Sequence, residues 1–247
     1  MINEGYSGSK LELIKKNNIL IVKKTNNIKR NLERYESLNY LNLSMPKIFN
    51  TSDNFYEMEY IYNIPMSVYI QKYDVDNLID FILKLLNNFT KNCVEKDFTN
   101  VYINKLENFN FKKYNLPFNA DQLIDKLPKI LPESEYYGDL TLDNILFDIK
   151  NNRFVLIDPA TIEYNSFVFD ISKLKQDLIC KWFIRNKNFN LDKKLNKIYE
   201  SLNKYPYYDN NYLLILMLMR ILLYSKNIKD EKFLYNNIVS LWNDQKH

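Results

Sequence analysis

Glycine is scarce in this sequence. Its 247 residues include three glycines, Gly5, Gly8 and Gly138, whereas average usage of about 7% predicts about seventeen. A chain that uses glycine so sparingly should keep it where a positive φ or a close approach to the backbone requires it. The segments around these three residues are therefore the first candidates for a functional role.

Histidine and cysteine are scarcer still. The only histidine is His247, which excludes Ser-His-Asp and Cys-His catalysis and zinc sites built from histidine and cysteine. The two cysteines, Cys93 and Cys180, cannot form a disulfide framework, which indicates a reducing, cytoplasmic environment. Carboxylates, amides, lysines and backbone groups remain for catalysis, and any metal must be held by oxygen ligands.

Long apolar runs and clusters of one charge are also missing. The longest apolar run, residues 212–219, stops at Arg220 and is too short to cross a bilayer. The first four residues lack the basic and apolar segments of a signal peptide. The 34 basic and 30 acidic residues are spread along the chain, which does not favour nucleic-acid binding. We expect a cytoplasmic protein with no membrane span and no nucleic-acid partner, and its oligomeric state stays open.

Hydrophobic periodicity predicts two lobes of different kinds. In the first lobe it predicts one helix, at 28–41, and strands at 10–14, 19–23, 47–50 and 55–61. In the second it predicts helices at 76–90, 120–126, 171–186, 191–203, 212–226 and 231–242, with one hairpin of strands 144–147 and 154–157. We therefore expect an α+β protein. Its small antiparallel-sheet lobe would span residues 1–61, and its larger, mainly helical lobe residues 62–247.

Polar residues collect at one end of the predicted hairpin. Asp139 and Asn144 come before its first strand, and Asp158 ends its second. The hairpin would bring Asn144 and Asp158 side by side, with Asp139 on the adjoining loop. Carboxylate and amide oxygens suit Mg²⁺, which takes one or two protein carboxylates and keeps several waters. Each residue alone could simply cap a turn or end a strand, but together, beside Gly138, they favour a Mg²⁺ site.

The same segment resembles a known family. Residues 137–146 read Tyr-Gly-Asp-Leu-Thr-Leu-Asp-Asn-Ile-Leu, residues 156–158 read Leu-Ile-Asp, and residues 169–174 read Phe-Asp-Ile-Ser-Lys-Leu. In this order they resemble the aminoglycoside phosphotransferase and choline kinase superfamily, which has the protein-kinase-like two-lobe fold. The likeness has two departures. Tyr137 stands where the family usually has histidine, at a position that mainly supports the loop, and Pro159 follows Asp158 where an aromatic residue is more usual.

The resemblance implies phosphoryl transfer from ATP, with roles for three residues near the hairpin. Asp139 would be the catalytic residue that accepts or orients the proton of the acceptor hydroxyl. Asn144 and Asp158 would hold Mg²⁺ on the phosphates of ATP. Phosphoryl transfer depends on positioning and charge neutralisation more than on covalent chemistry, so this set of residues suits the reaction.

In the small lobe, the resemblance points to a lysine on the second predicted strand. Lys23, at the end of Ile-Leu-Ile-Val-Lys, would bind the phosphates of ATP. Successive residues of a strand face opposite ways, so Lys24 should point away from the site and into solvent. Lys23 would need an acidic partner on the predicted helix, for which we slightly prefer Glu33 to Glu36. Both glutamates could instead be solvated.

Two further segments would complete the ATP site by the same resemblance. A loop over the phosphates would use backbone N–H and hydroxyl donors from Gly5, Ser7, Gly8 and Ser9. Taken alone, this Gly-x-x-Gly segment is nearly as consistent with a simple hairpin turn. The Met-Glu-Tyr-Ile sequence at 58–61 resembles the hinge between lobes, where backbone groups of Glu59 and Ile61 would meet the adenine edge.

The spacing between two aspartates narrows the class of molecule that could accept the phosphate. Only eleven residues separate Asp158 from Asp170, too few for the activation segment with which protein kinases bind a peptide. A small molecule with a hydroxyl group is therefore favoured. The Leu-Ile-Asp-Pro sequence at 156–159 resembles kinases of bacterial surface-polysaccharide loci, which suggests a sugar or polyol. Aromatic residues near Asp209 could instead hold a quaternary amine such as choline, stack on a sugar, or fill the core: Tyr205, Tyr207, Tyr208 and Tyr212.

These inferences predict a small-molecule kinase that depends on ATP and Mg²⁺. Two other functions stay open. A catalytically silent nucleotide-binding or scaffolding protein could share the fold. The presence of all four residues to which we assign a role in phosphate binding, metal binding or proton transfer argues against it: Lys23, Asp139, Asn144 and Asp158. A protein kinase would need an unusual substrate site.

Overall fold

A computed structural model describes residues 2–4, 9–16, 19–26 and 28–244. By backbone contacts the chain divides into two compact units. Unit 1 consists of Met1–Tyr73 and Leu142–Ile162, and unit 2 of Asp74–Thr141 and Glu163–His247. The predicted hairpin therefore belongs to the same unit as the N-terminal sheet. The division between residues 61 and 62 that we expected stays a prediction.

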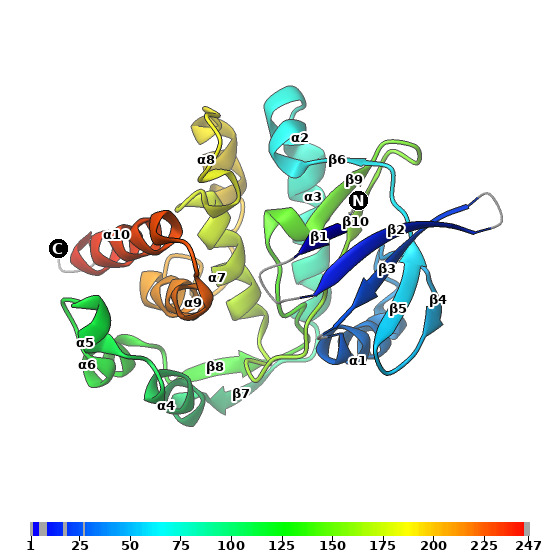
Figure 1. Ribbon diagram of the computed structural model, residues 1–247. Helices are drawn as coiled ribbons and strands as arrows, with labels where there is room; N and C mark the ends of the chain where they lie inside the picture. The colour runs from blue at the N-terminus through cyan, green and yellow to red at the C-terminus, as the bar shows by residue number, and fades with distance from the viewer. Residues whose placement is uncertain (1, 5–8, 17–18, 27, 245–247) are drawn as a thin grey trace. The chain divides into compact units, whose positions relative to one another are not determined.

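The described residues of unit 1 form two small sheets, two α-helices and two 3₁₀ turns (Figure 1). Its elements are β1 (Ile2–Glu4), β2 (Lys10–Lys16), β3 (Ile19–Thr25), α1 (Lys29–Leu38), η1 (Asn39–Leu41), β4 (Ile48–Thr51), β5 (Phe55–Glu59), β6 (Asn63–Ile64), α2 (Met66–Lys72), η2 (Leu142–Asn144), β9 (Ile145–Asp148) and β10 (Arg153–Leu156).

Unit 2 is mainly helical, with a two-stranded ladder of β7 and β8. Its elements are α3 (Asp76–Phe89), β7 (Val94–Asp97), α4 (Thr99–Glu107), α5 (Phe111–Tyr114), α6 (Ala120–Lys126), β8 (Ile130–Glu133), α7 (Phe167–Leu178), η3 (Trp182–Ile184), α8 (Asp192–Glu200), α9 (Asn211–Tyr224) and α10 (Ile228–Asp244).

The larger sheet of unit 1 is antiparallel, in the order β1-β2-β3-β5-β4. In the register between β3 and β5, Val22 lies opposite Met58, Lys24 opposite Tyr56, and Lys23 opposite Glu57. Directly opposed residues share a face of the sheet. Lys24 and Tyr56 therefore lie on one face, and Lys23 lies on the other.

Helix α1 packs on the face that carries Lys24. The helix contributes Tyr35, which is buried in one apolar cluster with Tyr56 and Met58 of β5 and with Ile28, the residue before the helix. Val22 packs against the same cluster. This packing decides which of the two adjacent lysines is buried.

The second sheet of unit 1, in the order β10-β9-β6, is built on the predicted hairpin. Strands β9 and β10 pair from Asp148↔Arg153 to Ile145↔Leu156. Tyr69 of α2 covers the sheet, with its ring centre 4.7 Å from that of Phe147. The hairpin thus ends at Ile145 and Leu156, close in the sequence to Asn144 and Asp158.

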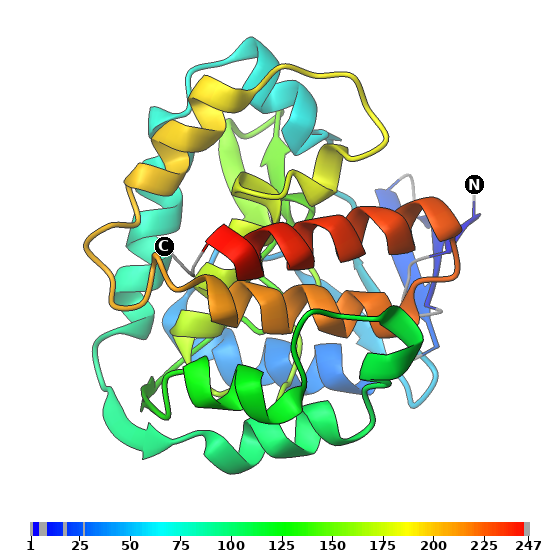
Figure 2. The same ribbon diagram turned by 90° about the vertical axis from the view of Figure 1, so that its left-hand side faces the viewer.

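Helix α7 is buried along its whole length at the centre of unit 2. It packs on α9, whose residues from Leu213 to Met219 are all buried, and α9 in turn lies beside α10 (Figure 2). Burying α7 on all sides is unusual for a helix that carries Asp170, Lys173, Lys175 and Asp177. Each of these charged side chains must therefore find a partner inside the protein.

The predicted α+β fold class is confirmed, and so is the existence of most of the predicted elements. Elements that the sequence pattern does not reveal include β7, α4 and α5. Strand β7 is largely exposed and shows no alternation, and α4 buries only Tyr102 and Leu106. Periodicity needs a continuous buried stripe, which these short elements lack.

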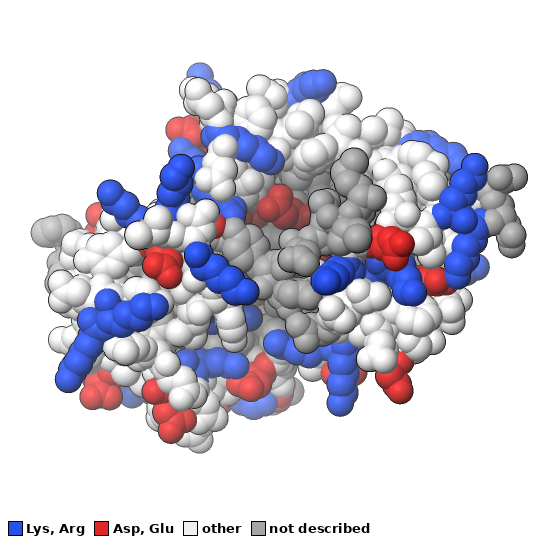
Figure 3. Space-filling view, viewed as in Figure 1, with Lys and Arg blue, Asp and Glu red and all other residues white. Residues whose placement is uncertain are grey.

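The surface is mixed in charge. On the face drawn in Figure 3, lysine and arginine are interspersed with aspartate and glutamate. No helix in the described part of the chain is long and apolar enough to cross a membrane.

Candidate active site

Lys24 forms a buried ion pair with Asp158. The residue is 3% exposed, and its Nζ lies 2.8 Å from Asp158 Oδ2. The expectation that Lys24 points into solvent is therefore wrong. The alternation of the strand was correct, but the core formed with α1 lies on the Lys24 face. Lys23 is on the opposite face, where its ammonium lies 4.3 Å from the centre of the Phe55 ring.

Two buried tyrosines lie beside Asp158. The hydroxyl of Tyr56 is 3.5 Å from Asp158 Oδ1, at the outer limit of a hydrogen bond. The Tyr35 ring meets the Tyr56 ring edge-on, with 6.0 Å between centres. Burial, followed by the negative charge of Asp158, raises the pKa of both phenols above the ordinary value. Both hydroxyls therefore stay neutral beside the carboxylate.

The backbone of Asn144 pairs with that of Ile157 at the end of the hairpin. This bond, from the Ile157 N–H to the Asn144 carbonyl at 3.0 Å, lies one step beyond the last pair of the ladder, so Asn144 is beside the residue that precedes Asp158. The expected meeting of the Asn144 and Asp158 side chains stays a prediction. Asp158 itself has φ 58°, a value uncommon for residues other than glycine. Six other non-glycine residues in the described part of the chain also have a positive φ, so this angle supports a functional site only together with the Lys24 contact.

This donor set fits Mg²⁺ bound together with phosphates. It would consist of one carboxylate from Asp158, whose side chain is 29% exposed, and one amide from Asn144. Mg²⁺ commonly takes one or two protein carboxylates and completes its shell with phosphate and water. In the described part of the chain, no group of three or more acidic, histidine or cysteine side chains forms an all-protein cage.

The predicted glutamate partner on α1 is not in the site. Glu33 and Glu36 are exposed, and Glu33 lies 3.9 Å from Lys29 on its own helix. The expected Glu33–Lys23 pair is therefore wrong. The buried positions of α1 are Arg34, Tyr35 and Leu38, so residues 33 and 36 fall on the solvent side. Tyr35 is the α1 residue that approaches Asp158.

The first turn of α1 also holds the segment that follows Asp158. Asn31 donates through Nδ2 to the Pro159 carbonyl at 2.6 Å. Arg30 donates to the Thr161 carbonyl at 2.7 Å, and the Thr161 N–H donates back to the Arg30 carbonyl at 3.0 Å. These hydrogen bonds hold residues 159–161, which follow Asp158 in the sequence, against the first turn of α1.

The predicted hinge residues lie at the end of β5. The Glu59 N–H donates to the Lys47 carbonyl, and the Ile61 carbonyl accepts from the Asn63 amide. Neither bond uses the Glu59 carbonyl or the Ile61 N–H, the groups that an adenine edge would need. A cavity of about 250 Å³ opens beside Glu59 and Tyr60.

Of the predicted phosphate loop, Gly5, Ser7 and Gly8 lie outside the described residues. Ser9 is 4% exposed and directly precedes β2. The strands that flank the loop, β1 and β2, pair antiparallel with Glu4 opposite Lys10. The proposed role of the loop stays a prediction.

In unit 2, the loop that carries Asp139 is anchored on Asp170 of α7. The carboxylate of Asp170 accepts from the backbone N–H groups of Tyr137 at 2.5 Å and Gly138 at 2.8 Å. Gly138 has φ 94°, a value that favours glycine, which explains why a glycine is kept here. Tyr137 is fully buried, as expected of a residue that supports the loop.

Asp139 pairs with Lys173, also on α7. The Lys173 Nζ lies 3.1 Å from Asp139 Oδ1; the lysine side chain is 8% exposed and that of Asp139 is 39% exposed. Sequence reasoning gave neither Asp170 nor Lys173 a role. Both lie in the Phe-Asp-Ile-Ser-Lys-Leu segment that carried the resemblance, so the sequence did contain a pointer to them.

The tyrosines around Asp209 do not share one set of contacts. Tyr205 is 6% exposed and donates to the Leu83 carbonyl and to Asn87 Oδ1. The rings of Tyr208 and Tyr212 pack on Tyr199 and Trp242, respectively. Of the alternatives that the sequence left open, filling the core describes Tyr205 best.

Sequence comparison finds no relative of this chain. No family model matches it, and no curated protein matches it. Its fold, in contrast, is similar to those of solved small-molecule kinases. A thermostable mutant of aminoglycoside phosphotransferase APH(4)-Ia, in a ternary complex with ADP and hygromycin B, superposes with a TM-score of 0.68 at 9% identity, covering 100% of this chain and 94% of that one.

Two other solved structures are similar. LicA in complex with AMP gives a TM-score of 0.62 at 15% identity, covering 98% of this chain and 91% of that one. A candidate fructosamine-3-kinase from Thermobifida fusca gives 0.58 at 11% identity, covering 98% and 93%. The chain has the fold of the aminoglycoside phosphotransferase and choline kinase superfamily. The resemblance found in residues 137–174 is thereby confirmed at the level of fold.

Proposed function

We propose that this protein is an ATP-dependent phosphotransferase that moves the γ-phosphate to a hydroxyl group of a small molecule. The observation that carries the proposal is the Lys24–Asp158 pair at 2.8 Å, on a backbone with φ 58° at Asp158 and beside Asn144. Removing an ammonium from water is costly unless it is paired. A buried cation next to oxygen ligands is the arrangement that phosphates and Mg²⁺ require.

In this proposal, Lys24 takes the phosphate-binding role that the sequence gave to Lys23. Asn144 and Asp158 would hold Mg²⁺, which would neutralise charge on the phosphates. The Glu59 carbonyl and the Ile61 N–H would meet adenine, and the loop at residues 5–9 would cover the phosphates. Solved structures of similar fold contain ADP or AMP, which supports nucleotide binding.

Asp139 would serve the acceptor. The acceptor oxygen bonds to the γ-phosphorus, the bond to the β–γ bridging oxygen breaks, and ADP leaves. Asp139 orients the acceptor hydroxyl and takes its proton as the new P–O bond forms. The side chain is exposed enough, at 39%, to meet an acceptor.

For the acceptor, we propose a sugar, polyol, amino alcohol or aminoglycoside. The short distance between Asp158 and Asp170 supports a small molecule over a peptide. The structure of the APH(4)-Ia mutant contains hygromycin B, and the similar protein from Thermobifida fusca is a candidate fructosamine-3-kinase, so hydroxyl-rich acceptors are tested first.

Two measurements test the proposal. A ligand that binds only the native state raises stability by RT ln(1 + [L]/Kd), so millimolar Mg-ATP should raise the melting temperature. ADP release should then be screened against the four acceptor classes. A protein that melts cooperatively, shows no shift with Mg-ATP and releases no ADP would contradict the proposed function.

A further inference from the structure

Helix α7 carries four buried charged residues, and their partners differ in kind. Asp170 accepts from two backbone N–H groups of the Asp139 loop, and Asp177 accepts from the Phe183 N–H at 3.2 Å. Lys175 donates to the Asn210 carbonyl at 3.0 Å. These bonds to backbone groups hold loops in place. The Lys173 ammonium instead faces the carboxylate of the candidate catalytic residue.

We propose that Lys173 is a positioning residue for catalysis, whose ammonium keeps the Asp139 carboxylate ionised and turned toward the acceptor hydroxyl. This inference rests on the proposed function. Its geometry is a Nζ–Oδ1 distance of 3.1 Å, with a nearly buried lysine behind a carboxylate that is 39% exposed. An opposite charge at this distance favours the ionised carboxylate, and the rigid α7 fixes the direction from which it acts.

The charges around Lys173 give the proposal a pH dependence. Asp139 from the loop and Asp177 from α7 favour the ammonium form, whereas burial and Arg220 of α9 oppose it. Burial is the largest of these effects, so the pKa of Lys173 lies below the ordinary value of a lysine. The ammonium is therefore lost at a lower pH than for a solvated lysine. Turnover should fall on the alkaline side as that proton is released.

The test compares Lys173→Met with Lys175→Met and Lys173→Arg. Lys175 is a matched control, because it is a fully buried lysine on the same helix that bonds a backbone carbonyl. The assay is ADP release from Mg-ATP with water as the acceptor. Lys173→Met should lose about tenfold to a hundredfold, the range for one hydrogen bond to a charged group. It should keep the Mg-ATP shift in melting temperature, and Lys175→Met should stay within about twofold of the parent protein.

The pH profile separates positioning from folding. Arginine keeps the charge but does not titrate in the accessible range, so Lys173→Arg should retain turnover while its alkaline decline moves to higher pH. The inference is overturned if Lys173→Met keeps more than half its turnover or if Lys175→Met matches its loss. Should Lys173→Met fail to fold, an unchanged alkaline decline in Lys173→Arg overturns it. Absence of ADP release by the unmodified protein, whatever the acceptor, would instead contradict the proposed function and remove the basis of this inference.

Discussion

At the scale of residues, the functional assignment depends largely on the buried ammonium of Lys24. Lys23 and Lys24 are adjacent and chemically identical, yet Lys24 is paired with Asp158 and Lys23 lies over the Phe55 ring on the other face. Lys23 and Phe55 are both half-buried, and a cation–π contact that is not fully desolvated contributes on the order of 1 kcal/mol. A buried ion pair, in contrast, leaves a strongly unfavourable charge when one partner is removed. The two lysines should therefore respond very differently to substitution.

We expect Lys24→Met to weaken Mg-ATP binding about tenfold to a hundredfold, the range for loss of one hydrogen bond to a charged group. Lys23→Met, on the neighbouring position of the same strand, should change it by less than about twofold, because Lys23 lies on the opposite face of the sheet from Asp158. Isothermal titration calorimetry on both variants, well below their melting temperatures, measures the difference. Equal losses in both, or a larger loss in Lys23→Met, would return the phosphate-binding role to Lys23.

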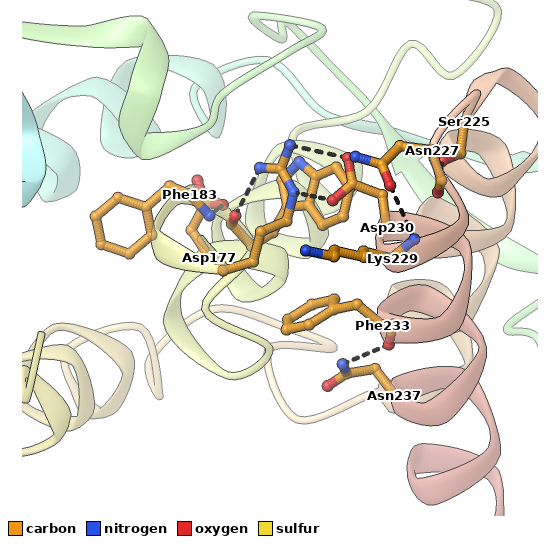
Figure 4. Close-up of polar contacts among 10 residues, drawn as sticks. Asp177, Phe183, Ser225, Asn227, Lys229, Asp230, Phe233 and Asn237 are labelled. Atoms are coloured by element: carbon orange, nitrogen blue, oxygen red, sulfur yellow. Dashed lines mark hydrogen bonds and ion pairs between the residues drawn. The ribbon is translucent and has the colours of Figure 1, made fainter. Parts of the chain in front are cut away.

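At the scale of elements, buried polar contacts hold neighbouring elements together. The clearest case connects η3 to α10 (Figure 4). Arg185 donates to both carboxylate oxygens of Asp230, at 2.9 and 3.2 Å, and stacks on Trp182 with its Cζ 3.7 Å from the ring centre. The two charged side chains are 13% and 3% exposed. This largely buried, bidentate ion pair therefore connects the end of η3 to α10.

Removing one member of this pair should destabilise the fold strongly. Asp230→Ala leaves a buried guanidinium without its carboxylate, and we expect a loss of about 3–5 kcal/mol in the free energy of unfolding. Urea denaturation gives the value. Replacing both residues, as Arg185→Met with Asp230→Leu, should cost less than Asp230→Ala alone, because no unpaired charge is left in the protein.

An exposed ion pair provides the control for that cycle. Lys197 lies 2.5 Å from Asp76, but the side chains are 50% and 64% exposed. Lys197→Met should leave the denaturation midpoint unchanged within error, because surface pairs contribute little. If Asp230→Ala were as mild as Lys197→Met, the Arg185–Asp230 pair would not be a structural link between η3 and α10.

At the scale of the whole molecule, the sequence predicts the elements whose hydrophobic pattern is regular and the segments that carry a recognisable motif. The hairpin, the Asp139 loop and the helices with a continuous apolar stripe follow from periodicity and from residues 137–174. Which face of β3 is buried does not follow from the sequence. Alternation separates Lys23 from Lys24, but only tertiary packing by Tyr35 and Tyr56 decides which face is covered. The same limit explains Glu33, whose charge suggested a partner while its position on α1 placed it in solvent.

Lys173 shows a second limit of sequence reasoning. A lysine in a helix is normally assigned to the surface, and nothing in the local pattern marks it as buried beside Asp139. Its burial follows from α7 being covered along its length, a property of the assembled unit. In the proposed function, Lys24, Asn144 and Asp158 would serve ATP, and Asp139 with Lys173 would serve the acceptor.

That separation of roles leads to a prediction for the reaction as a whole. Asp139→Asn keeps the size of the side chain but removes the group that takes the acceptor proton. Turnover should fall by about 10²–10⁴-fold, the usual contribution of a positioned base, and the loss should appear in kcat. Asp158→Ala should instead abolish the metal-dependent part of the Mg-ATP shift in melting temperature.

The two variants together distinguish catalysis from loop structure. If Asp139 only capped its loop, Asp139→Asn would have one of two effects. It would keep its activity, because the neighbouring Tyr137 and Gly138 are anchored through Asp170. Otherwise it would lower the activity and the melting temperature together. A catalytic role requires the opposite pattern, in which kcat is lost while the KM for ATP, the melting temperature and the Mg-ATP shift are kept. Retention of more than about a tenth of the parent kcat, a loss smaller than any positioned base is expected to cause, would end the assignment of Asp139.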